Sequence, residues 1–338
     1  MRTIDWVDGA VRIIDQTALP AREVWLDLST VEDVVDAIAR LAVRGAPALG
    51  VAGAMGVALA ARQFRADVQA RDAAVRSLRA ARPTAVNLAR GVDLAAAALP
   101  DGPDAVLVAA LDLRDAEVSA SEAMARLGAD LVTKLCGTTP RLLTHCNTGG
   151  LATVTGGTAL GVIVELHRRG QLDGVIASET RPLLQGARLT AWELGRAGIG
   201  YRVAVDGAGP FLMARGEVDA VILGADRVCA NGDVVNKVGT YAHALGAQAA
   251  GLPFIVVAPE STMDPDTVAG ADVPIEGRDR DEVLGYGTAR VAPDGADAIN
   301  LAFDVTPHHL VTAVVTETRV LTKQGTLLNR DRRAGDPS

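Results

Sequence analysis

Aromatic residues are scarce in this chain of 338 residues: phenylalanine, tryptophan and tyrosine together make up 3% of the sequence. Because so few large side chains are available, the core has to be built from Ala, Val and Leu. Cysteine is also rare. The three cysteines, Cys136, Cys146 and Cys229, are odd in number and show no metal-ligand spacing, which favours a reduced, cytoplasmic compartment.

Basic residues are not in excess: 33 lysines and arginines stand against 41 aspartates and glutamates, which gives a formal net charge of −8. They are scattered, whereas nucleic-acid binding needs a concentrated basic face. We therefore expect no nucleic-acid partner, although one or two cations suffice for a small phosphorylated ligand. The longest apolar stretch, residues 46–61, is too short to span a bilayer, and the N-terminus lacks the apolar run of a signal peptide, so we expect no membrane association.

Residues 1–118 show a mainly helical pattern with a small β element near the start. Ser29-Thr30 precedes residues 31–33, a capping signature that predicts a helix from there to about Leu41. Glycine recurs at every third position within the apolar segment 46–61, which gives a buried helix one smooth face for close packing. We expect a mainly helical N-terminal domain over 1–118.

After a long helix that leads to Cys136, short apolar runs alternate with helical stretches. The expected strands are 142–146, 175–178, 202–205, 220–223, 254–258 and 311–315, and the expected helices are 157–169, 185–196, 209–215 and 236–250. Apolar strands that alternate with helices form a parallel sheet covered on both faces. The fold class is therefore α/β, with a Rossmann-like, doubly wound domain over 119–338 that carries most of the site. No Gly-x-Gly-x-x-Gly motif follows the first strand, so we expect no dinucleotide.

Two side chains follow expected strands at the edge where parallel sheets bind ligands. Cys146 stands at the end of the first expected strand and precedes a glycine turn whose backbone N–H groups can bind an anion. Position alone leaves a functional thiol and a small buried side chain equally open. Asp226 follows the central strand, where a carboxylate is costly unless paired or functional. An ion pair with Arg227 is the alternative, but strand ends favour a catalytic acid.

Several polar residues stand where an anion can bind. Arg44 and Arg82 precede helices, and arginine suits the planar, bidentate recognition of phosphate. Asn236-Lys237 is expected to open a helix, where a lysine opposes the helix dipole unless it shares an anion with the first N–H groups. Gln185 lies after the second strand, at the edge of the crevice. Taken singly, surface ion pairs and a solvated lysine are the alternatives. The five histidines show no metal spacing and are expected to be structural or on the surface.

Seven strings occur together in order along the chain. They are Arg44-Gly45-Ala46-Pro47-Ala48, Arg82-Pro83-Thr84-Ala85-Val86-Asn87-Leu88, Thr144-His145-Cys146-Asn147-Thr148-Gly149, Glu179-Thr180-Arg181-Pro182-Leu183-Leu184-Gln185-Gly186, Gly224-Ala225-Asp226-Arg227, Asn236-Lys237-Val238-Gly239-Thr240 and Phe303-Asp304-Val305-Thr306-Pro307. On the basis of these strings, the chain from about residue 31 to residue 317 closely resembles the 5-methylthioribose-1-phosphate isomerases of methionine salvage. That family shares its fold with regulatory subunits of a eukaryotic translation-initiation exchange factor.

The resemblance implies isomerisation of 5-methylthioribose 1-phosphate to the ribulose 1-phosphate, without a metal or an organic cofactor. It matches Cys146 to the family's cysteine and Asp226 to its acid. Its substrate contacts carry over onto Arg44, the backbone of Ala46, Arg82, Gln185, Asn236 and Lys237. It also implies a homodimer. A phosphate on C1 locks the sugar ring, so Asp226 is expected to protonate the ring oxygen. Cys146 then either acts as the base or flanks a hydride shift.

Two positions depart from the family pattern: Gly277 stands where the family usually has glutamate, and Leu301 where it has proline. Because of these two departures, the group on C5 of the substrate stays open: it is either a methylthio group or the hydrogen of a 5-deoxy sugar. An isomerase of ribose 1,5-bisphosphate is a further alternative, but a second phosphate calls for an additional basic cluster, which the sequence lacks. The last alternative is a non-catalytic regulatory subunit, although both the thiol and the acid are present in their motifs.

Overall fold

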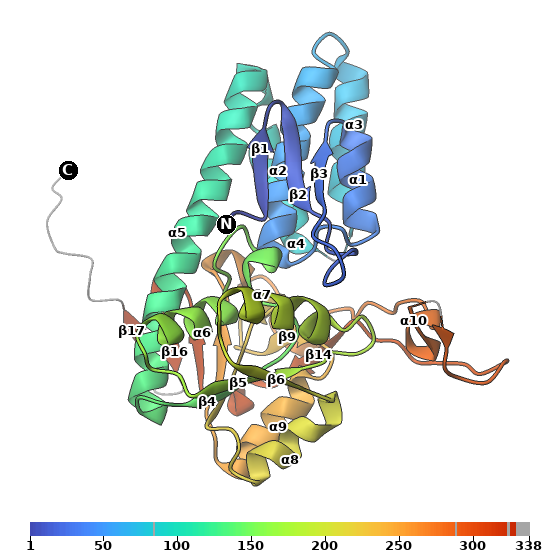
Figure 1. Ribbon diagram of the computed structural model, residues 1–338. Coiled ribbons are helices and arrows are strands. Elements are labelled where there is room, and N and C mark those ends of the chain that lie inside the picture. Colours follow the sequence, from blue (N-terminus) through green and yellow to red (C-terminus); the bar gives the residue numbers. More distant parts are fainter. Residues whose placement is uncertain (84, 288, 323–324, 329–338) are drawn as a thin grey trace, which may run out of the picture.

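The computed structural model describes residues 1–83, 85–287, 289–322 and 325–328, so that Thr84 of the second string lies outside the described residues. Figure 1 shows an N-terminal part standing above a sheet domain, with one long helix, α5 (Pro103–Cys136), running beside both. The boundary expected at residue 118 falls inside this helix. α5 packs against the N-terminal part at one end and against the sheet domain at the other.

The N-terminal part combines a small antiparallel sheet with four helices. Its elements are β1 (Ile4–Val7), β2 (Ala10–Ile14), β3 (Trp25–Leu28), α1 (Val31–Ala39), α2 (Ala46–Gln63), α3 (Val68–Ala80) and α4 (Val86–Ala96). Thr30 caps α1: its side chain accepts the N–H of Asp33, whose carboxylate accepts the N–H of Thr30. The capping signature at Thr30 is thereby confirmed.

Helix α2 forms the centre of the N-terminal part, and every residue from Pro47 to Ala61 is buried. Its glycines let α4 approach closely: a Cβ atom on Gly91 of α4 would lie 2.0 Å from the carbonyl oxygen of Gly50. The expected buried helix with a smooth glycine face is confirmed. Because α2 is fixed on all sides, the residues just before it are held firmly at its N-terminus.

The second part is built on an eight-stranded sheet with the order β17-β16-β15-β10-β7-β4-β5-β6. Its strands are β4 (Arg141–Thr144), β5 (Gly174–Ser178), β6 (Tyr201–Ala204), β7 (Ala220–Leu223), β10 (Phe254–Val257), β15 (Ala313–Val315), β16 (Arg319–Thr322) and β17 (Gly325–Leu328). The first six pair in parallel, and β16 and β17 are antiparallel. All six expected strands are present. The order reverses between β4 and β7, as in a Rossmann fold, and ligands bind at such a switch point.

Helices cover both faces of this sheet, as expected for a doubly wound domain (Figure 1). α5, α6 (Ala159–Arg168) and α7 (Ala191–Arg196) pack on one face, while α8 (Gly209–Ala214) and α9 (Thr240–Ala250) pack on the other. A π-helical turn over Gly186–Thr190 leads into α7. Among the described helices, none is long and apolar enough to cross a membrane.

The expectation that Asn236-Lys237 opens a helix is wrong. Both residues end strand β9 (Val234–Lys237), and α9 begins only at Thr240, after Gly239 with φ +106°. The physical reason is a small second sheet: the apolar residues that begin β9 pair with β8 (Arg227–Cys229) and β14 (Phe303–Thr306). β11 (Met263–Asp264) completes this sheet. The turn signal before β9 thus belongs to a hairpin.

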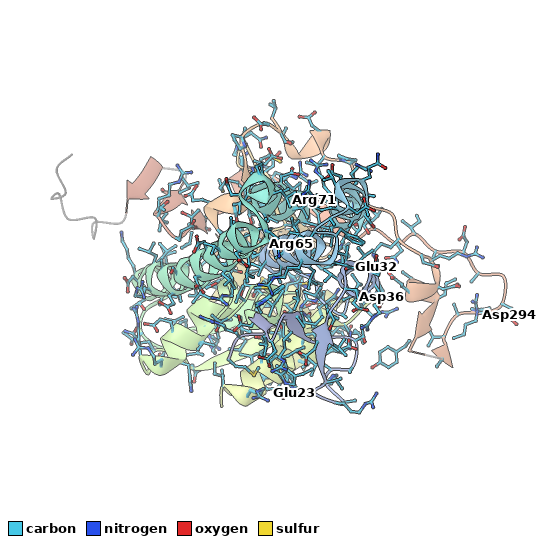
Figure 2. All side chains as sticks on the ribbon, turned by 90° about the horizontal axis from the view of Figure 1, so that it is seen from above. Glu23, Glu32, Asp36, Arg65, Arg71 and Asp294 are labelled. Carbon is cyan, nitrogen blue, oxygen red and sulfur yellow. The ribbon has the colours of Figure 1, made fainter. Side chains whose placement is uncertain are left out.

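An arm leaves the sheet domain between β11 and β14 (Figure 1). It carries α10 (Asp281–Leu284), β12 (Gly285–Tyr286) and β13 (Ala289–Arg290). Figure 2 shows its Asp294 far from the body, and it places Glu32, Asp36, Arg65 and Arg71 on the N-terminal part, with both charge signs present. Short 3₁₀ turns cover Leu99–Asp101, Gly150–Ala152, Asp206–Ala208, Glu260–Thr262, Gly270–Asp272 and His308–Leu310.

Candidate active site

Cys146 lies at the carboxyl end of β4, beside the switch point of the sheet. It is half-buried and has a φ of +62°, a left-handed conformation that is uncommon outside glycine. Two threonines hold its backbone: its N–H donates to Oγ1 of Thr180 at 2.9 Å, and its carbonyl accepts from Oγ1 of Thr190 at 2.6 Å. The thiol is therefore presented from a fixed turn rather than packed as a core side chain.

Asp226 lies at the carboxyl end of β7, on the other side of the switch point. Its N–H donates to the carbonyl of Val235 at 3.0 Å, which ties this loop to β9. Arg227 does not pair with it, because Nη1 of Arg227 contacts Oδ2 of Asp264 at 2.8 Å. Burial raises the pKa of Asp226, while the charges of Lys237 and two arginines oppose that rise. A carboxyl group of this kind keeps its proton more readily than an exposed one.

Asp226 borders a cavity of about 340 Å³ between the two parts of the chain. The lining residues are Gly45, Ala46, Leu49, Arg82, Pro83, Ala85, Val86, Asp226, Arg227, Val235, Val273, Pro274 and Phe303. Arg82 also lies 3.9 Å from a carboxylate oxygen of Glu276. One acid, Asp226, and two arginines, Arg82 and Arg227, therefore line a cavity whose wall is otherwise apolar.

Lys237 extends from the end of β9 and is only 8% exposed. Its Nζ lies 5.0 Å from the ring centroid of Phe303, within the range of a cation–π interaction. Burial lowers its pKa, and the nearby Cys146 and Asp226 raise it. The solvated lysine considered from sequence is therefore excluded. Its neighbour Asn236 is also buried, and its Nδ2 donates to Oγ1 of Thr240 at 2.9 Å.

Arg44 is buried, with 8% of its surface exposed, and is therefore not a surface ion pair. It precedes Gly45, whose φ is +94° and where a Cβ atom would lie 2.4 Å from the carbonyl oxygen of Ala152. One guanidinium nitrogen, Nη2, donates to Oδ1 of Asn147, while the buried Nε has no protein partner among the described residues. Burial lowers the pKa of Arg44, and Cys146 is the charge that most strongly opposes this.

The residues that hold Arg44 in position were not identified from the sequence. Nδ2 of Asn147 donates to Oε1 of Glu193 at 2.7 Å, and the same carboxylate accepts the N–H groups of Gly150 and Leu151. A Cβ atom on Gly149 would lie 2.3 Å from that Oε1 atom. The glycine turn therefore admits a buried carboxylate. Glu193 gave no signal in the sequence, because it stands alone on a helix 46 residues beyond Asn147.

Gln185 lies farther along the crevice. It is buried, and its Oε1 has no hydrogen-bond partner among the described residues. It lines a second cavity, of about 650 Å³, together with Arg44. Since Gly45 and Ala46 line the first cavity, residues 44–46 border both.

The structure places Ala46, Arg82 and Asp226 on the first cavity and Arg44 and Gln185 on the second. Arg44 and Lys237 each interact electrostatically with Cys146, Asp226 and Arg82. Ala46 shares the cavity of Asp226, whereas Asn236 bonds within its own loop and Gln185 lies in the second cavity.

The other two cysteines are not part of this arrangement, whereas His145 lies next to Cys146 and its Nε2 contacts the carbonyl oxygen of Val238 at 2.8 Å. Cys136 and Cys229 are free thiols, and burial raises the pKa of Cys136 to about 11. His145 and His243 are buried rather than on the surface. Over the residues that the structure describes, no cluster of three or more His, Cys, Asp or Glu is arranged to hold a metal ion.

Chemically, this arrangement offers three things. Buried cations attract a compact anion such as phosphate more strongly than exposed cations do. Asp226 is a carboxyl group suited to donating a proton, because burial favours its neutral form. Cys146 offers a thiol on the opposite side of the switch point.

The raised pKa of Asp226 makes a testable statement about stability. Because the folded chain binds this proton more tightly than the unfolded chain does, the resulting stabilisation is complete at low pH and is lost as pH rises through the folded pKa. We therefore expect the Asp226→Asn variant to have a higher Tm than the wild type at pH 8, with the difference shrinking toward pH 4. Differential scanning calorimetry over this range measures it.

The matched control is Asp219→Asn, at the amino end of β7. The hydrogen bonds from Arg141 lower the pKa of Asp219, so this variant should lose stability at pH 8. A lower Tm for Asp226→Asn at pH 8 would contradict the assigned direction of its pKa.

Comparison with known proteins places this site in a family. Residues 42–323 match the model of the initiation factor 2 subunit family. A probable bifunctional methylthioribose-1-phosphate isomerase/methylthioribulose-1-phosphate dehydratase of Nocardia farcinica is 51% identical over 94% of this chain, which spans 59% of that longer relative. Methylthioribose-1-phosphate isomerases of Alkalilimnicola ehrlichii and Anaeromyxobacter dehalogenans are 48% and 52% identical, over 96% and 92% of this chain and 95% and 90% of theirs.

Solved structures agree with these relatives. The 5-methylthioribose 1-phosphate isomerase of Pyrococcus horikoshii superposes with a TM-score of 0.88 at 39% identity, covering 95% of this chain and 92% of its own. The translation initiation factor eIF-2B subunit delta from A. fulgidus gives a TM-score of 0.83 at 41% identity, covering 96% of both chains. This chain belongs to the initiation factor 2 subunit family and, within it, to the methylthioribose-1-phosphate isomerases.

Proposed function

We propose that this chain is an aldose–ketose isomerase that converts 5-methylthioribose 1-phosphate to 5-methylthioribulose 1-phosphate in methionine salvage. The relatives described above carry this activity in their names at about half identity over nearly the whole chain. The observation that carries the proposal is the crevice itself. Two buried cations, Arg44 and Lys237, interact there with the thiol of Cys146 and the carboxyl group of Asp226.

The buried cations are the groups that would bind the phosphate. Arg44 and Lys237 would hold the phosphate group, with Arg82 at the rim of the cavity. The N–H of Ala46 lies at the N-terminus of α2, where backbone donors have no partner within the helix. Oε1 of Gln185 is a buried acceptor without a protein partner, which suits a sugar hydroxyl. Asn236 would contribute its side chain beside Lys237.

The chemistry begins with the closed ring. The C1 phosphate blocks the free aldehyde, so Asp226 donates its proton to the ring oxygen as the bond from that oxygen to C1 breaks. Hydrogen then moves from C2 to C1, and the 2-hydroxyl gives its proton to the Asp226 carboxylate as the ketone forms. That proton balances the one given to the ring oxygen. Cys146 either removes the C2 proton and returns it to C1 through a cis-enediol-like intermediate, or flanks a direct hydride shift.

The cavity wall favours an apolar group at C5. Val273, Pro274 and Phe303 line the cavity beside Asp226. A methylthio group, or the hydrogen of a 5-deoxy sugar, fits such a wall. A second phosphate would lose its hydration there, and the two arginines that line the cavity already have partners: Arg227 pairs with Asp264, and Arg82 lies 3.9 Å from Glu276. This supports a 5-methylthio or 5-deoxy substrate over ribose 1,5-bisphosphate.

The activity is tested directly with 5-methylthioribose 1-phosphate, 5-deoxyribose 1-phosphate and ribose 1,5-bisphosphate as substrates. We expect the first to give the highest kcat/KM. Cys146→Ser and Asp226→Asn should still fold and bind substrate but lose turnover by about 100-fold or more, since each removes a group that acts on the reacting atoms. Cys136→Ser is the matched thiol control and should keep wild-type turnover.

Near-normal turnover in either site variant would overturn the assigned roles. No turnover of any of the three substrates by the wild type would favour a non-catalytic regulatory subunit on the same fold.

We further propose a homodimer in the cytoplasm. Exposed apolar side chains gather on β6, α8 and α9: Val203 is 47% exposed, Val205 62% and Phe211 65%, with Tyr241 and Leu245 on the neighbouring helix. β6 is an edge strand of the sheet, and an edge strand beside an exposed apolar patch is typical of a surface that a second copy of the chain covers. Three free thiols fit a reducing compartment.

Light scattering tests the dimer. The wild type should have twice the chain mass, and Phe211→Glu should shift it toward the monomer because a charge would be buried in the interface. Leu94→Glu, on the N-terminal part at 46% exposed, is the control and should leave the mass unchanged. A monomeric wild type would contradict the proposal.

A further inference from the structure

Asp206 belongs to none of the strings that carry the family resemblance, yet it has an unusual set of partners. It lies just after β6, at the same edge of the sheet as Cys146. Its Oδ1 accepts the hydroxyl of Ser178 and the N–H of Thr180 at 2.8 Å, and its Oδ2 accepts the N–H of Arg181 at 2.7 Å. One carboxylate therefore holds the whole turn that follows β5.

That turn contains a strained residue. Thr180 has a φ of +66°, a left-handed conformation that is especially unfavourable for a β-branched side chain. Close packing leaves this turn little freedom: a Cβ atom on Gly186 would lie 1.7 Å from the carbonyl oxygen of Ser178. The hydrogen bonds to Asp206 are what keep the backbone at Thr180 in this conformation.

Thr180 in turn holds Cys146. Its hydroxyl donates to the carbonyl of Ser178 at 3.0 Å, which leaves its oxygen free to accept the N–H of Cys146 at 2.9 Å. Cys146 is itself in a left-handed conformation. The three residues come from the carboxyl ends of neighbouring parallel strands, β4, β5 and β6. They form a chain of hydrogen bonds from the sheet edge to the thiol-bearing backbone.

Two histidines also contact this chain: Nδ1 of His145 lies 3.5 Å from Oγ1 of Thr180, and Nε2 of His243 lies 3.3 Å from Oγ of Ser178. Nδ1 of His145 lies 4.0 Å from Oδ1 of Asp206, while its Nε2 lies 2.8 Å from the carbonyl of Val238. Burial lowers the pKa of His145 and lowers that of His243 to about 3, so both rings are neutral at physiological pH. Asp206 is therefore not the counter-ion of a charged imidazole, and its main partners are backbone and hydroxyl donors.

We propose that Asp206 is a positioning residue: through Thr180 it fixes the backbone at Cys146 and thereby the direction of the thiol. The inference rests on the proposed function, because it assumes that Cys146 acts on the substrate.

The test compares Asp206→Asn with the wild type, because the amide keeps the size of the side chain but removes one acceptor oxygen. We expect kcat to fall roughly 10- to 100-fold, since misplacing a reacting group by a fraction of an ångström has effects of this order. KM should change by less than about threefold, because no substrate contact is lost. Asp219→Asn is the matched control: it likewise removes one of two carboxylate oxygens, which together accept three bonds from Arg141 at the opposite end of the strands, and kcat should not change.

A second pair of variants separates positioning from general destabilisation. Thr180→Ser keeps the hydroxyl and should retain most of the wild-type kcat. Thr180→Val keeps the shape of the side chain but leaves the Cys146 N–H without its acceptor, so its kcat should fall. A further readout needs no substrate: the rate constant for alkylation of Cys146 by iodoacetamide, followed by peptide mass spectrometry with Cys136 as internal reference. It should change in Asp206→Asn and Thr180→Val and stay constant in Asp219→Asn.

Wild-type kcat and alkylation rate in Asp206→Asn would overturn the inference, and so would wild-type values in Thr180→Val. An active Cys146→Ser variant would instead overturn the catalytic role of the thiol, whatever Asp206 does. The two failures are therefore distinguishable.

Discussion

The site depends on one buried contact between the two parts of the chain, the hydrogen bond from Arg44 to Asn147. Arg44 comes from the N-terminal part, just before α2, and Asn147 comes from the turn after β4. A buried guanidinium is costly unless its donors are satisfied. Asn147 accepts from Nη2 of Arg44 and is itself oriented by Glu193, while the buried Nε of Arg44 has no protein partner among the described residues. The crevice between Arg44 and Asp226 therefore exists only when the two parts are docked.

The remaining charges follow from this contact. Burial lowers the pKa of both Arg44 and Lys237, and their interactions with Cys146 and Asp226 oppose that lowering. Asp226 is destabilised by the same burial, which raises its pKa. Burying these charged groups is unfavourable, and the packing of α2 and of the parallel sheet keeps them in position. Such a loss of stability is common where function and stability conflict.

Much of this could be predicted from sequence, because local pattern decides it. The six parallel strands are short apolar runs, and Cys146 and Asp226 lie within three residues of the ends of two of them. The N-terminal cap at Thr30 and the glycine face of α2 are equally local signals. The helix expected at Asn236-Lys237 is wrong because pairing with the neighbouring strand β8 and the distant strand β14 overrode a turn signal that fits either structure.

Glu193 and Asp206 could not be found from the sequence. Each acts through partners that are far away along the chain, and an isolated acidic residue near a helix or a turn is ordinarily a surface residue. Even for Arg44, the pattern left a surface ion pair open, and only the packing of α2 against the sheet domain buries it.

The most direct measurement is a crystal structure of the Cys146→Ser variant with 5-methylthioribose 1-phosphate. The account predicts the phosphate within hydrogen-bond distance of Arg44 and Lys237, and the ring oxygen within reach of the Asp226 carboxyl group. A sugar phosphate bound elsewhere, or one whose ring oxygen faces away from Asp226, would contradict it.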